Sequence, residues 1–457
     1  MYDRSLVILH RDLRINDNTA IINALQQSHS CALVFILTPE QLVSNDYYSP
    51  TAVNFMLQSV AEIPKINVYY GDYIAVVRDI IGSWSPNAIF INIDYTPYAV
   101  ARTKSTREVA KENGIDCNEY EDYLLHNLLN DQILTRAQTP YQKFTPYYNL
   151  ALTIPVAQPI QVNAQESKLR VLLLTNNIVS ADGEINMNLL PNIKLMQPDC
   201  VGGRRAGLAL LSQLRNYERN NLPTPTSRLS PYIKFGCVSI REVHAHASAL
   251  NTRSNTRSNT RSDVKRSIND HNMTDFIREL HWRDFYTRVA WYFPRVLAGP
   301  NRYMHSANNK YTAYTNNSAY ITAWKEGKTG IPAVDAGMRQ LQLTGYMPNR
   351  ARLITSSYLV KDLMVDWQIG EKYFAQMLTD YDPSVNNGNW QWVAGCGVDA
   401  QPYFRTFNPF KQGRKFDPEC AWIKKYIVEL ADVPNEDIHT WDVNYTKHNV
   451  YIAPIKN

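Results

Sequence analysis

The first 130 residues alternate between short apolar runs and longer amphipathic stretches, and this alternation limits the possible folds more than any other feature of the chain. Short apolar runs between turn-forming residues are typical of buried strands. The predicted strands are Leu6–Leu9, Ala32–Leu37, Ile66–Tyr70 and Ala88–Ile93, and the predicted helices between them are Asp17–Gln26, Thr51–Ile63, Tyr73–Ile81 and Tyr98–Glu112. Such alternation predicts an α/β fold with a doubly wound parallel sheet. No GxGxxG motif follows the first strand, so a standard Rossmann dinucleotide site is not supported.

The chain has 457 residues, which is too long for a single ordinary core. From about residue 131 to 195 the apolar residues show no clear period, and after about residue 200 helical spacing dominates to the end. We therefore predict an N-terminal α/β domain (1–130), an interdomain connector (131–195) and a C-terminal all-α domain (196–457).

Three tandem copies of NTRS make up Asn251–Ser262. A period of four is too short for a solenoid repeat, and the polarity of the segment predicts a loop in solvent. No function follows from the repeat itself.

Charge and cysteine content exclude few classes of protein. The net charge of +5 permits a polyanionic partner without requiring one. No stretch approaches the roughly 20 apolar residues of a membrane span, and Leu6–Leu9 is read as a buried strand and not as a secretory signal. The six cysteines are scattered without a CxxC pair, which disfavours disulfides or a zinc site and favours a reducing cytoplasm.

Tryptophan is distributed very unevenly. Eight of the nine tryptophans, all except Trp84, lie after residue 280. Either the second half has a large aromatic core, or it holds an aromatic site for a planar ligand.

The segment Thr226–Tyr232 reads TSRLSPY, in which Ser230 and Pro231 fit the start of a helix. Its hydroxyl groups, together with Arg228 and free helix amides, suit a phosphate group. An ordinary helix cap explains the same residues equally well.

The segment Met273–Trp291 is predicted to form one helix with two different faces. At about 100° per residue, the apolar side chains on the side that faces the core are Ile277, Leu280 and Phe285. The opposite surface stripe combines Glu279, Trp282, Arg283 and Tyr286. These side chains suit a stacked base and a nearby phosphate, and the alternative is a solvated face with one stray tryptophan.

Three polar residues, Asn349, Arg350 and Arg352, crowd the start of the predicted helix within Gly345–Trp367. Positive charge is unfavourable at a helix N-terminus, so an anionic partner is expected nearby. A phosphate, an acidic side chain or water would each serve.

The segment Asp380–Phe410 is rich in Asn, Gly and Pro and is predicted to be irregular backbone around a polar aromatic ligand. Trp390 and Trp392 are two residues apart, so we expect them to contact different neighbours.

These segments together resemble the class I photolyase/cryptochrome family over nearly the whole chain. The matching motifs, in the family's order, are HRDLRINDN, TSRLSPY, ELHWRDFY, WKEGKTGIPAVDAGMRQL, NRARLITSSYLVKDLMVDW and NNGNWQW…PYFRTFNP. The pattern is most similar to the cyclobutane pyrimidine dimer photolyases. The resemblance implies an α/β antenna domain followed by an all-α domain that binds FAD.

The resemblance also implies which residues hold FAD. The positions that match its phosphate, flavin and ribose contacts are Tyr217, Thr226, Ser227, Arg228, Leu229, Ser230, Arg352, Asp380, Tyr381 and Asp382, with Asn386 facing flavin N5. Asp380 matches the ion-pair partner of Arg352.

Further positions match the family's reactive residues. Trp390 and Trp367 match the first two members of the electron-transfer chain that photoreduces the flavin. The positions that match the dimer pocket are Glu279, Trp282, Arg283, Asn349, Arg350 and Trp392, and Tyr286 shares the stripe of Glu279. The implied reaction is electron transfer from excited reduced FAD to a dimer flipped out of double-stranded DNA, with Glu279, if protonated, donating a hydrogen bond to the dimer. A monomer in the cytoplasm, at the nucleoid when bound to damaged DNA, is expected.

Several residues depart from the family's pattern. Tyr314 stands where the third, surface tryptophan of the electron-transfer chain is usual. We expect Tyr314 to be the last electron donor of that chain; the alternative is another aromatic residue, such as Tyr311 or Tyr320. Tyr346 replaces a tryptophan, and Leu353 replaces a methionine beside the substrate pocket. Ala101–Arg102 replaces the Asn–Glu pair of folate-binding relatives, which disfavours folate as antenna and leaves a deazaflavin, a second flavin or no antenna open.

Three rival interpretations remain. A cryptochrome, a light-signalling protein without repair activity, is disfavoured by the intact dimer-pocket positions and by a chain that ends soon after the shared region. A photolyase for (6-4) photoproducts is disfavoured because Pro348–Asn349 stands in place of a histidine pair. A light-independent flavoprotein or nucleic-acid-binding module would leave the chain of tryptophans unexplained.

Overall fold

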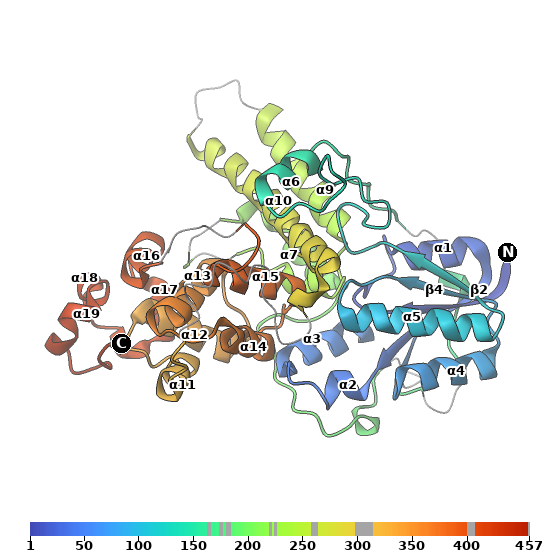
Figure 1. The fold of residues 1–457 in the computed structure, drawn as a ribbon, viewed down its shortest axis with the longest axis horizontal. Coiled ribbons are helices and arrows are strands. Elements are labelled where there is room, and N and C mark those ends of the chain that lie inside the picture. The colour runs from blue at the N-terminus through green and yellow to red at the C-terminus, as the bar shows by residue number, and fades with distance from the viewer. Residues whose placement is uncertain are drawn as a thin grey trace.

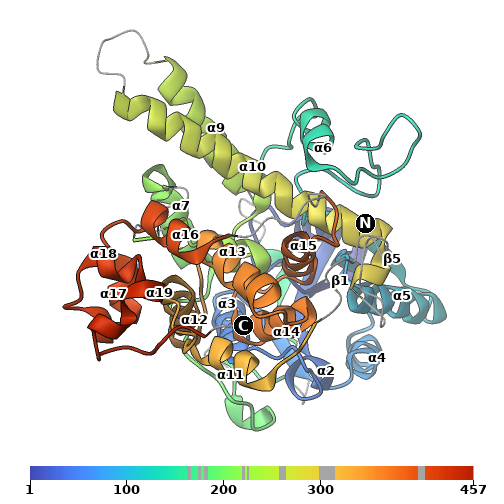
Figure 2. The same cartoon turned by 60° about the vertical axis from the view of Figure 1, so that its left-hand side comes forward.

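The computed structural model describes residues 1–161, 166–172, 177–179, 184–218, 222–223, 226–256, 264–297, 314–399 and 407–455. Its α/β part and its helical part lie side by side, and the long helices α9 (Ile240–Thr256) and α10 (Val264–Tyr292) cross between them and project beyond the body (Figures 1 and 2).

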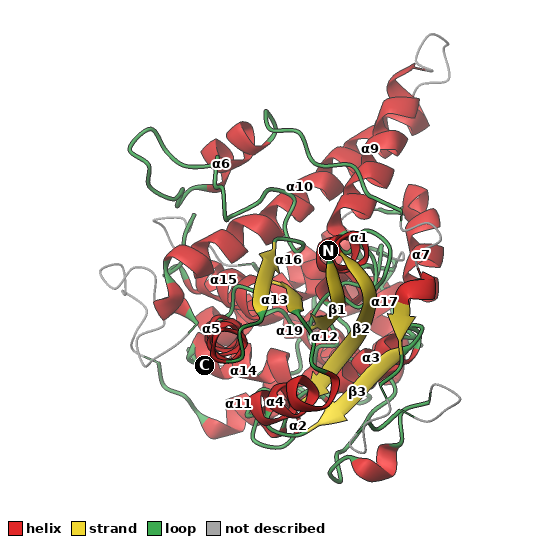
Figure 3. Ribbon diagram, turned by 90° about the vertical axis from the view of Figure 1, so that its right-hand side faces the viewer, coloured by secondary structure: helices red, strands yellow, loops and turns green. Residues whose placement is uncertain are grey.

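The N-terminal part is built on a parallel sheet whose strand order is β3-β2-β1-β4-β5, with β6 added beside β2. Figure 3 shows β1, β2 and β3 of this sheet. The strands are β1 (Tyr2–Leu9), β2 (Ser28–Leu37), β3 (Ile66–Tyr70), β4 (Ala88–Asn92), β5 (Asp116–Tyr120) and β6 (Leu169–Arg170). The helices of this part are α1 (Thr19–Gln27), α2 (Pro39–Leu42), α3 (Pro50–Ala61), α4 (Tyr73–Trp84) and α5 (Pro97–Glu112). The predicted doubly wound parallel sheet is confirmed, and β5 and β6 are additions to it.

Alternating side chains of the central strands face two separate cores. Val7 and Leu9 of β1 pack with α1 and α3, whereas Leu6 and Ile8 pack with α4 and α5. A strand buried on both faces is apolar at every position, which is why its sequence shows a continuous apolar run.

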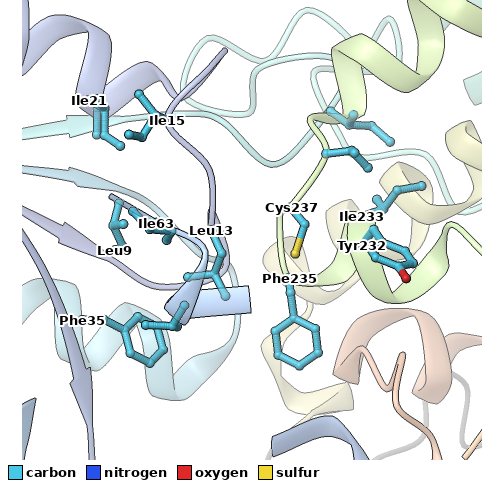
Figure 4. Packing of buried hydrophobic residues seen from close by; sticks show 14 of the residues in the cluster. Leu9, Leu13, Ile15, Ile21, Phe35, Ile63, Tyr232, Ile233, Phe235 and Cys237 are labelled. Carbon is cyan, nitrogen blue, oxygen red and sulfur yellow. The ribbon is translucent and has the colours of Figure 1, made fainter. Parts of the chain in front are cut away.

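The first of these cores continues into the helical part without a break. Leu13 and Phe35 lie on one side, and Phe235 and Cys237 lie on the other (Figure 4). The two parts of the chain therefore share one buried interface.

The C-terminal part is helical through most of its described length. After α6 (Phe144–Ala151) and α7 (Arg204–Ser212) come α8 (Ser230–Lys234), α9, α10, α11 (Ser318–Glu326), α12 (Pro332–Thr344), α13 (Asn349–Ser357), α14 (Trp367–Met377), α15 (Pro383–Ala394), α16 (Pro409–Phe416), α17 (Ala421–Tyr426), α18 (Asn435–Ile438) and α19 (Trp441–Asn444). No helix within the described residues combines the length and the apolarity needed to cross a bilayer.

Two predictions of irregular backbone are wrong. Helix α9 continues through Asn251–Thr256, the first half of the NTRS repeat, and the following residues 257–263 lie outside the described part. Helix α15 occupies residues 383–394, where Asn and Gly had suggested a loop. It forms because Asp382 caps its N-terminus, Pro383 occupies the first turn, and Gly395 ends it in a left-handed conformation with φ of 77°.

Candidate functional site

A cavity of about 450 Å³ opens between α8, α10, α13 and α15. Its volume lies within the range of roughly 300–1,000 Å³ that is usual for small-molecule and cofactor sites. The predicted site residues that line it are Tyr217, Thr226, Ser227, Leu229, Ser230, Glu279, Trp282, Arg283, Tyr286, Asn349, Arg350, Arg352, Asp380, Tyr381, Asp382, Asn386, Trp390 and Trp392. The structure thus brings together segments that are up to 175 residues apart in the chain.

Three predicted residues lie outside this lining. The guanidinium of Arg228 forms an ion pair with Asp199 at 2.7 Å. Trp367 is fully buried at the start of α14, and Tyr314 is half-buried against the same hydrophobic core. The last two could therefore act on the cavity only through other side chains.

The expected anionic partner at the start of α13 is Asp380. Arg352 donates from Nη2 to both of its carboxylate oxygens, at 2.7 and 3.0 Å. Ser230 Oγ donates to the same carboxylate at 2.6 Å. This ion pair connects α8, α13 and the entry to α15.

Asp382 joins the cavity to the α/β part. Its Oδ1 accepts from the backbone amides of Ser384 and Val385, and its Oδ2 accepts from Arg11 at 2.8 Å and from the hydroxyl of Tyr123. Burial alone would raise the pKa of Asp382, but the guanidiniums of Arg11 and Arg283 outweigh it and lower the pKa below its usual value. Asp382 is therefore a stable anion at neutral pH.

The ring of Tyr123 lies between two guanidiniums. The Arg11 guanidinium lies 4.4 Å from the ring centroid and that of Arg283 lies 3.6 Å from it. Arg283 also donates to the Tyr123 carbonyl at 2.7 Å. Arg283 lines the cavity as predicted, but its guanidinium is held at the interface with the α/β part.

Asn386 is held in one orientation by a buried carboxyl group. Its Nδ2 donates to the Glu371 carbonyl at 3.2 Å and to Glu371 Oε1 at 3.1 Å. Because the amide nitrogen is engaged in this way, the amide oxygen remains for a ligand in the cavity.

The stripe predicted on α10 faces the cavity, and the prediction that it lies on the surface is wrong for Tyr286, which is 4% exposed. Trp282 stacks on Phe144 of α6 with ring centroids 3.6 Å apart and planes at 6°. Phe144 covers one face of the indole and fixes its orientation.

Trp390 and Trp392 contact different neighbours, which confirms the expectation from their spacing. Trp390 is 2% exposed and meets Phe374 edge to face at 5.0 Å and Trp324 at 6.3 Å. The ring centroid of Trp392 lies 6.3 Å from that of Phe407.

Several residues of the site were not among the predicted site residues. Tyr346, noted only as a substitution, shares a short hydrogen bond with Thr226. Tyr123, Phe144 and Glu371 come from segments that the sequence patterns did not connect with the cavity. Arg11 was detectable only as part of the HRDLR motif.

The donors and acceptors around the cavity fit FAD. The hydroxyls of Thr226 and Ser227 and the cation of Lys234 suit phosphate or anionic groups, and aromatic side chains such as Tyr381 and Trp390 suit a planar ring.

Comparisons with known proteins agree with this geometry. The DNA photolyase family model matches residues 5–163, and the model for the FAD binding domain of DNA photolyase matches residues 276–456. The chain is 32% identical to a deoxyribodipyrimidine photo-lyase of Halobacterium salinarum, over 94% of this chain and 90% of that protein.

Solved structures of similar proteins have the same fold. An archaeal photolyase from Sulfolobus tokodaii, which holds two FAD molecules, is 38% identical with a TM-score of 0.80, covering 99% of this chain and 96% of that one. A Synechocystis cryptochrome is 24% identical with a TM-score of 0.83, covering 100% and 97% of the two chains.

Proposed function

This chain belongs to the DNA photolyase family, and we propose that it uses light to repair cyclobutane pyrimidine dimers in DNA, with FAD held in the cavity between α8 and α15. One observation supports this most directly. Residues that match the dimer pocket and residues that match the FAD site line a single continuous cavity, so donor and acceptor would lie side by side.

The FAD contacts are proposed to come from two sides. Thr226, Ser227 and Ser230 would hold the phosphates, and Asp380, Tyr381, Asp382 and Asn386 would line the flavin and ribose. Once bound and reduced, FAD supplies the light-excited electron that splits the dimer.

The dimer contacts are proposed to come from α10, α13 and α15. Enzymes that act on bases, photolyases among them, take the target out of the helical stack. Trp282, held by Phe144, and Trp392 would offer apolar faces to the flipped dimer, and Asn349 would bond a base edge. Arg350 would contact the DNA backbone independently of sequence. Glu279 would hydrogen-bond the dimer.

The decisive experiment is repair in light and darkness. Purified, reduced protein is mixed with an oligonucleotide that carries one dimer, and intact thymines are measured by chromatography. Repair under blue light and none in the dark is expected. Binding of DNA without repair in light would contradict the proposal and favour a cryptochrome-type photoreceptor.

The cofactor itself has a simpler test. The protein is expected to purify yellow or blue because it binds FAD tightly. It is also expected to be a monomer in solution. A colourless preparation that FAD cannot reconstitute would contradict the whole assignment. The two FAD molecules of the archaeal relative support a second flavin as antenna here, which extraction would reveal as two FAD per chain.

A further inference from the structure

Lys234, the last residue of α8, lines the cavity. Within the described residues its ammonium has no hydrogen-bond acceptor and no ion-pair partner, and it lies 3.5 Å over the ring of Phe235. The other cations nearby are engaged, since Arg352 pairs with Asp380 and Arg283 donates to the Tyr123 carbonyl.

The charged groups around Lys234 come from three segments. They are Arg11 after β1, Asp94 after β4, and Asp380 and Asp382 before α15. Arg11 forms ion pairs with Asp94 and Asp382, at 2.6 and 2.8 Å, so these carboxylates already have partners. Burial, and then the charge of Arg11, lower the pKa of Lys234 to about 7 despite the carboxylates.

A partly dehydrated ammonium without an acceptor is costly, and a ligand that brings negative charge removes the cost. Lys234 lies one helical turn after Ser230, whose hydroxyl bonds Asp380, so it faces the end of the cavity where Asp380 and Asp382 lie. Thr226 and Ser227, which suit phosphates, lie earlier in the segment.

We propose that Lys234 is the charge partner of the reduced flavin, and that its ammonium neutralises the negative charge which the flavin ring gains on reduction. This inference rests on the proposed FAD site. It assigns to Lys234 control over the reduction of the cofactor, separately from the contact with DNA.

The charge balance gives a measurable consequence. Reduction of FAD to its anionic reduced form takes up two electrons and one proton. Where Lys234 is neutral in the oxidised protein, its protonation adds a second proton. Each proton taken up with two electrons changes the midpoint potential by about 30 mV per pH unit.

In wild type the midpoint potential of FAD should therefore fall by about 60 mV per pH unit above pH 7 and by about 30 mV per pH unit below it. In Lys234→Met the slope should stay near 30 mV throughout. At pH 6 the equilibrium ratio of reduced to oxidised FAD should be about tenfold lower in this variant than in wild type. This corresponds to a midpoint potential that is lower by about 30 mV. Lys234→Arg, charged at every pH, should keep the wild-type potential at pH 6 but lose the steep slope.

The test is a spectroelectrochemical titration of the FAD-loaded protein from pH 6 to 9, with dithionite as reductant and no DNA. Lys234→Gln serves as a second neutral variant if Lys234→Met folds poorly. Equal potentials and slopes in wild type and the neutral variants would overturn the proposal. Weaker binding of oxidised FAD with an unshifted potential would also overturn it, because Lys234 would then serve the pyrophosphate. A protein that binds FAD but fails to repair dimers would contradict the proposed function and leave this test intact.

Discussion

Glu279 and Arg350 line one cavity but are expected to contribute to different steps. Glu279→Ala should lower repair per absorbed photon roughly tenfold to a hundredfold while changing DNA affinity little, because its hydrogen bond matters after the electron reaches the dimer. Arg350→Ala should weaken DNA binding and reduce the slope of log affinity against log salt by about 0.9, because one phosphate contact is lost.

Repair yields and binding isotherms over a salt series separate these effects. Arg350 also lies 4.3 Å over the ring of Phe416, so Arg350→Lys is the control that keeps charge while changing this contact. If Glu279→Ala repaired as well as wild type, the role given to Glu279 would be wrong.

Tyr314 is expected to end the route by which an oxidising hole leaves the flavin. Trp390 and Trp367 are buried in one hydrophobic core, and Tyr314 packs against this core while remaining partly exposed. A terminal donor must lose its proton to water, and the radical cation of a phenol is a strong acid. Transient absorption of Tyr314→Phe should show a shorter radical lifetime, and Trp390→Phe should abolish photoreduction.

Two other tyrosines serve as comparisons. Tyr320 packs against the same core, and Tyr373 contacts Trp324, which itself meets Trp390; Tyr311 lies outside the described residues. An unchanged lifetime in Tyr314→Phe, with a shortened one in Tyr320→Phe or Tyr373→Phe, would remove Tyr314 from the route. Repair by chemically reduced protein should survive all of these substitutions.

The residues of the site were predictable only where several polar or aromatic groups cluster in one segment. Glu279 and Trp282 share a helical face, and such a face is visible in the sequence. The contact of Arg11 with Asp382 spans 371 residues, and no local pattern reports such a distance. Lys234 was missed because a single lysine at a helix end is ordinary in sequence and becomes unusual only beside a cavity.

At the scale of elements, the crossing of α10 and α15 depends on Gly388. A Cβ at this position would lie 2.2 Å from Cδ1 of the buried Tyr286 ring. Gly388→Ala should therefore destabilise the protein by about 1–3 kcal/mol and weaken FAD retention, although alanine favours the helix itself. Gly82→Ala in α4 is the matched control, because nothing lies within 4 Å of its Cβ, and it should stabilise by about 0.5–1 kcal/mol.

Urea unfolding and FAD release measure both variants. If Gly388→Ala and wild type were equally stable, α10 and α15 could move apart without a cost in the free energy of unfolding, and the close crossing would not depend on Gly388.

Elements were predicted well where burial leaves a strong apolar pattern. Strands β3 and β4 and helices α1, α3, α4 and α5 appear close to their predicted positions, whereas β1 and β2 begin at Tyr2 and Ser28, before the predicted Leu6 and Ala32. Strand β5 was missed because its sequence, DCNEY, is polar and half-buried at the sheet edge. Helix α15 was missed because its caps and tertiary packing outweigh the low helix propensity of Asn and Gly.

At the scale of the molecule, a buried ion network joins the two parts of the chain. Asp122 accepts from Arg14 at 2.5 Å and from Arg241 of α9 at 2.8 Å, and Arg241 also reaches Asp17 at 2.9 Å. Removing one member would leave an uncompensated buried charge, which typically costs about 3–5 kcal/mol. With the shared apolar core, this network packs the two parts against each other, which their separate sequence patterns did not indicate.

Beside this network, three histidines make the interface sensitive to acid. His281 of α10 is 1% exposed, and its ring lies 5.8 Å from that of His126 and 6.5 Å from that of His244. Burial, reinforced by the neighbouring imidazoles and Arg288, lowers the pKa of His281 to about 3; burial, with Arg288, lowers that of His126 to about 4. The rings of His126 and His281 are therefore neutral in the folded protein over most of the acidic range.

Because the folded pKa values lie below the ordinary 6.5, the unfolded chain binds more protons as pH falls. The stability that His281 contributes is present above pH 6.5 and is lost between pH 6.5 and about 3, at about 1.4 kcal/mol per pH unit. Between pH 7 and pH 5, the free energy of unfolding measured in urea should therefore fall by about 2 kcal/mol less in His281→Phe than in wild type.

Burial raises the pKa of Glu121 to about 8 and that of Asp284 to about 6, which opposes acid unfolding. This contribution is shared by both proteins and cancels in the difference. The exposed His29→Gln is the control and should follow wild type. If His281→Phe lost as much stability as wild type on acidification, protonation at this interface would not be what unfolds the protein.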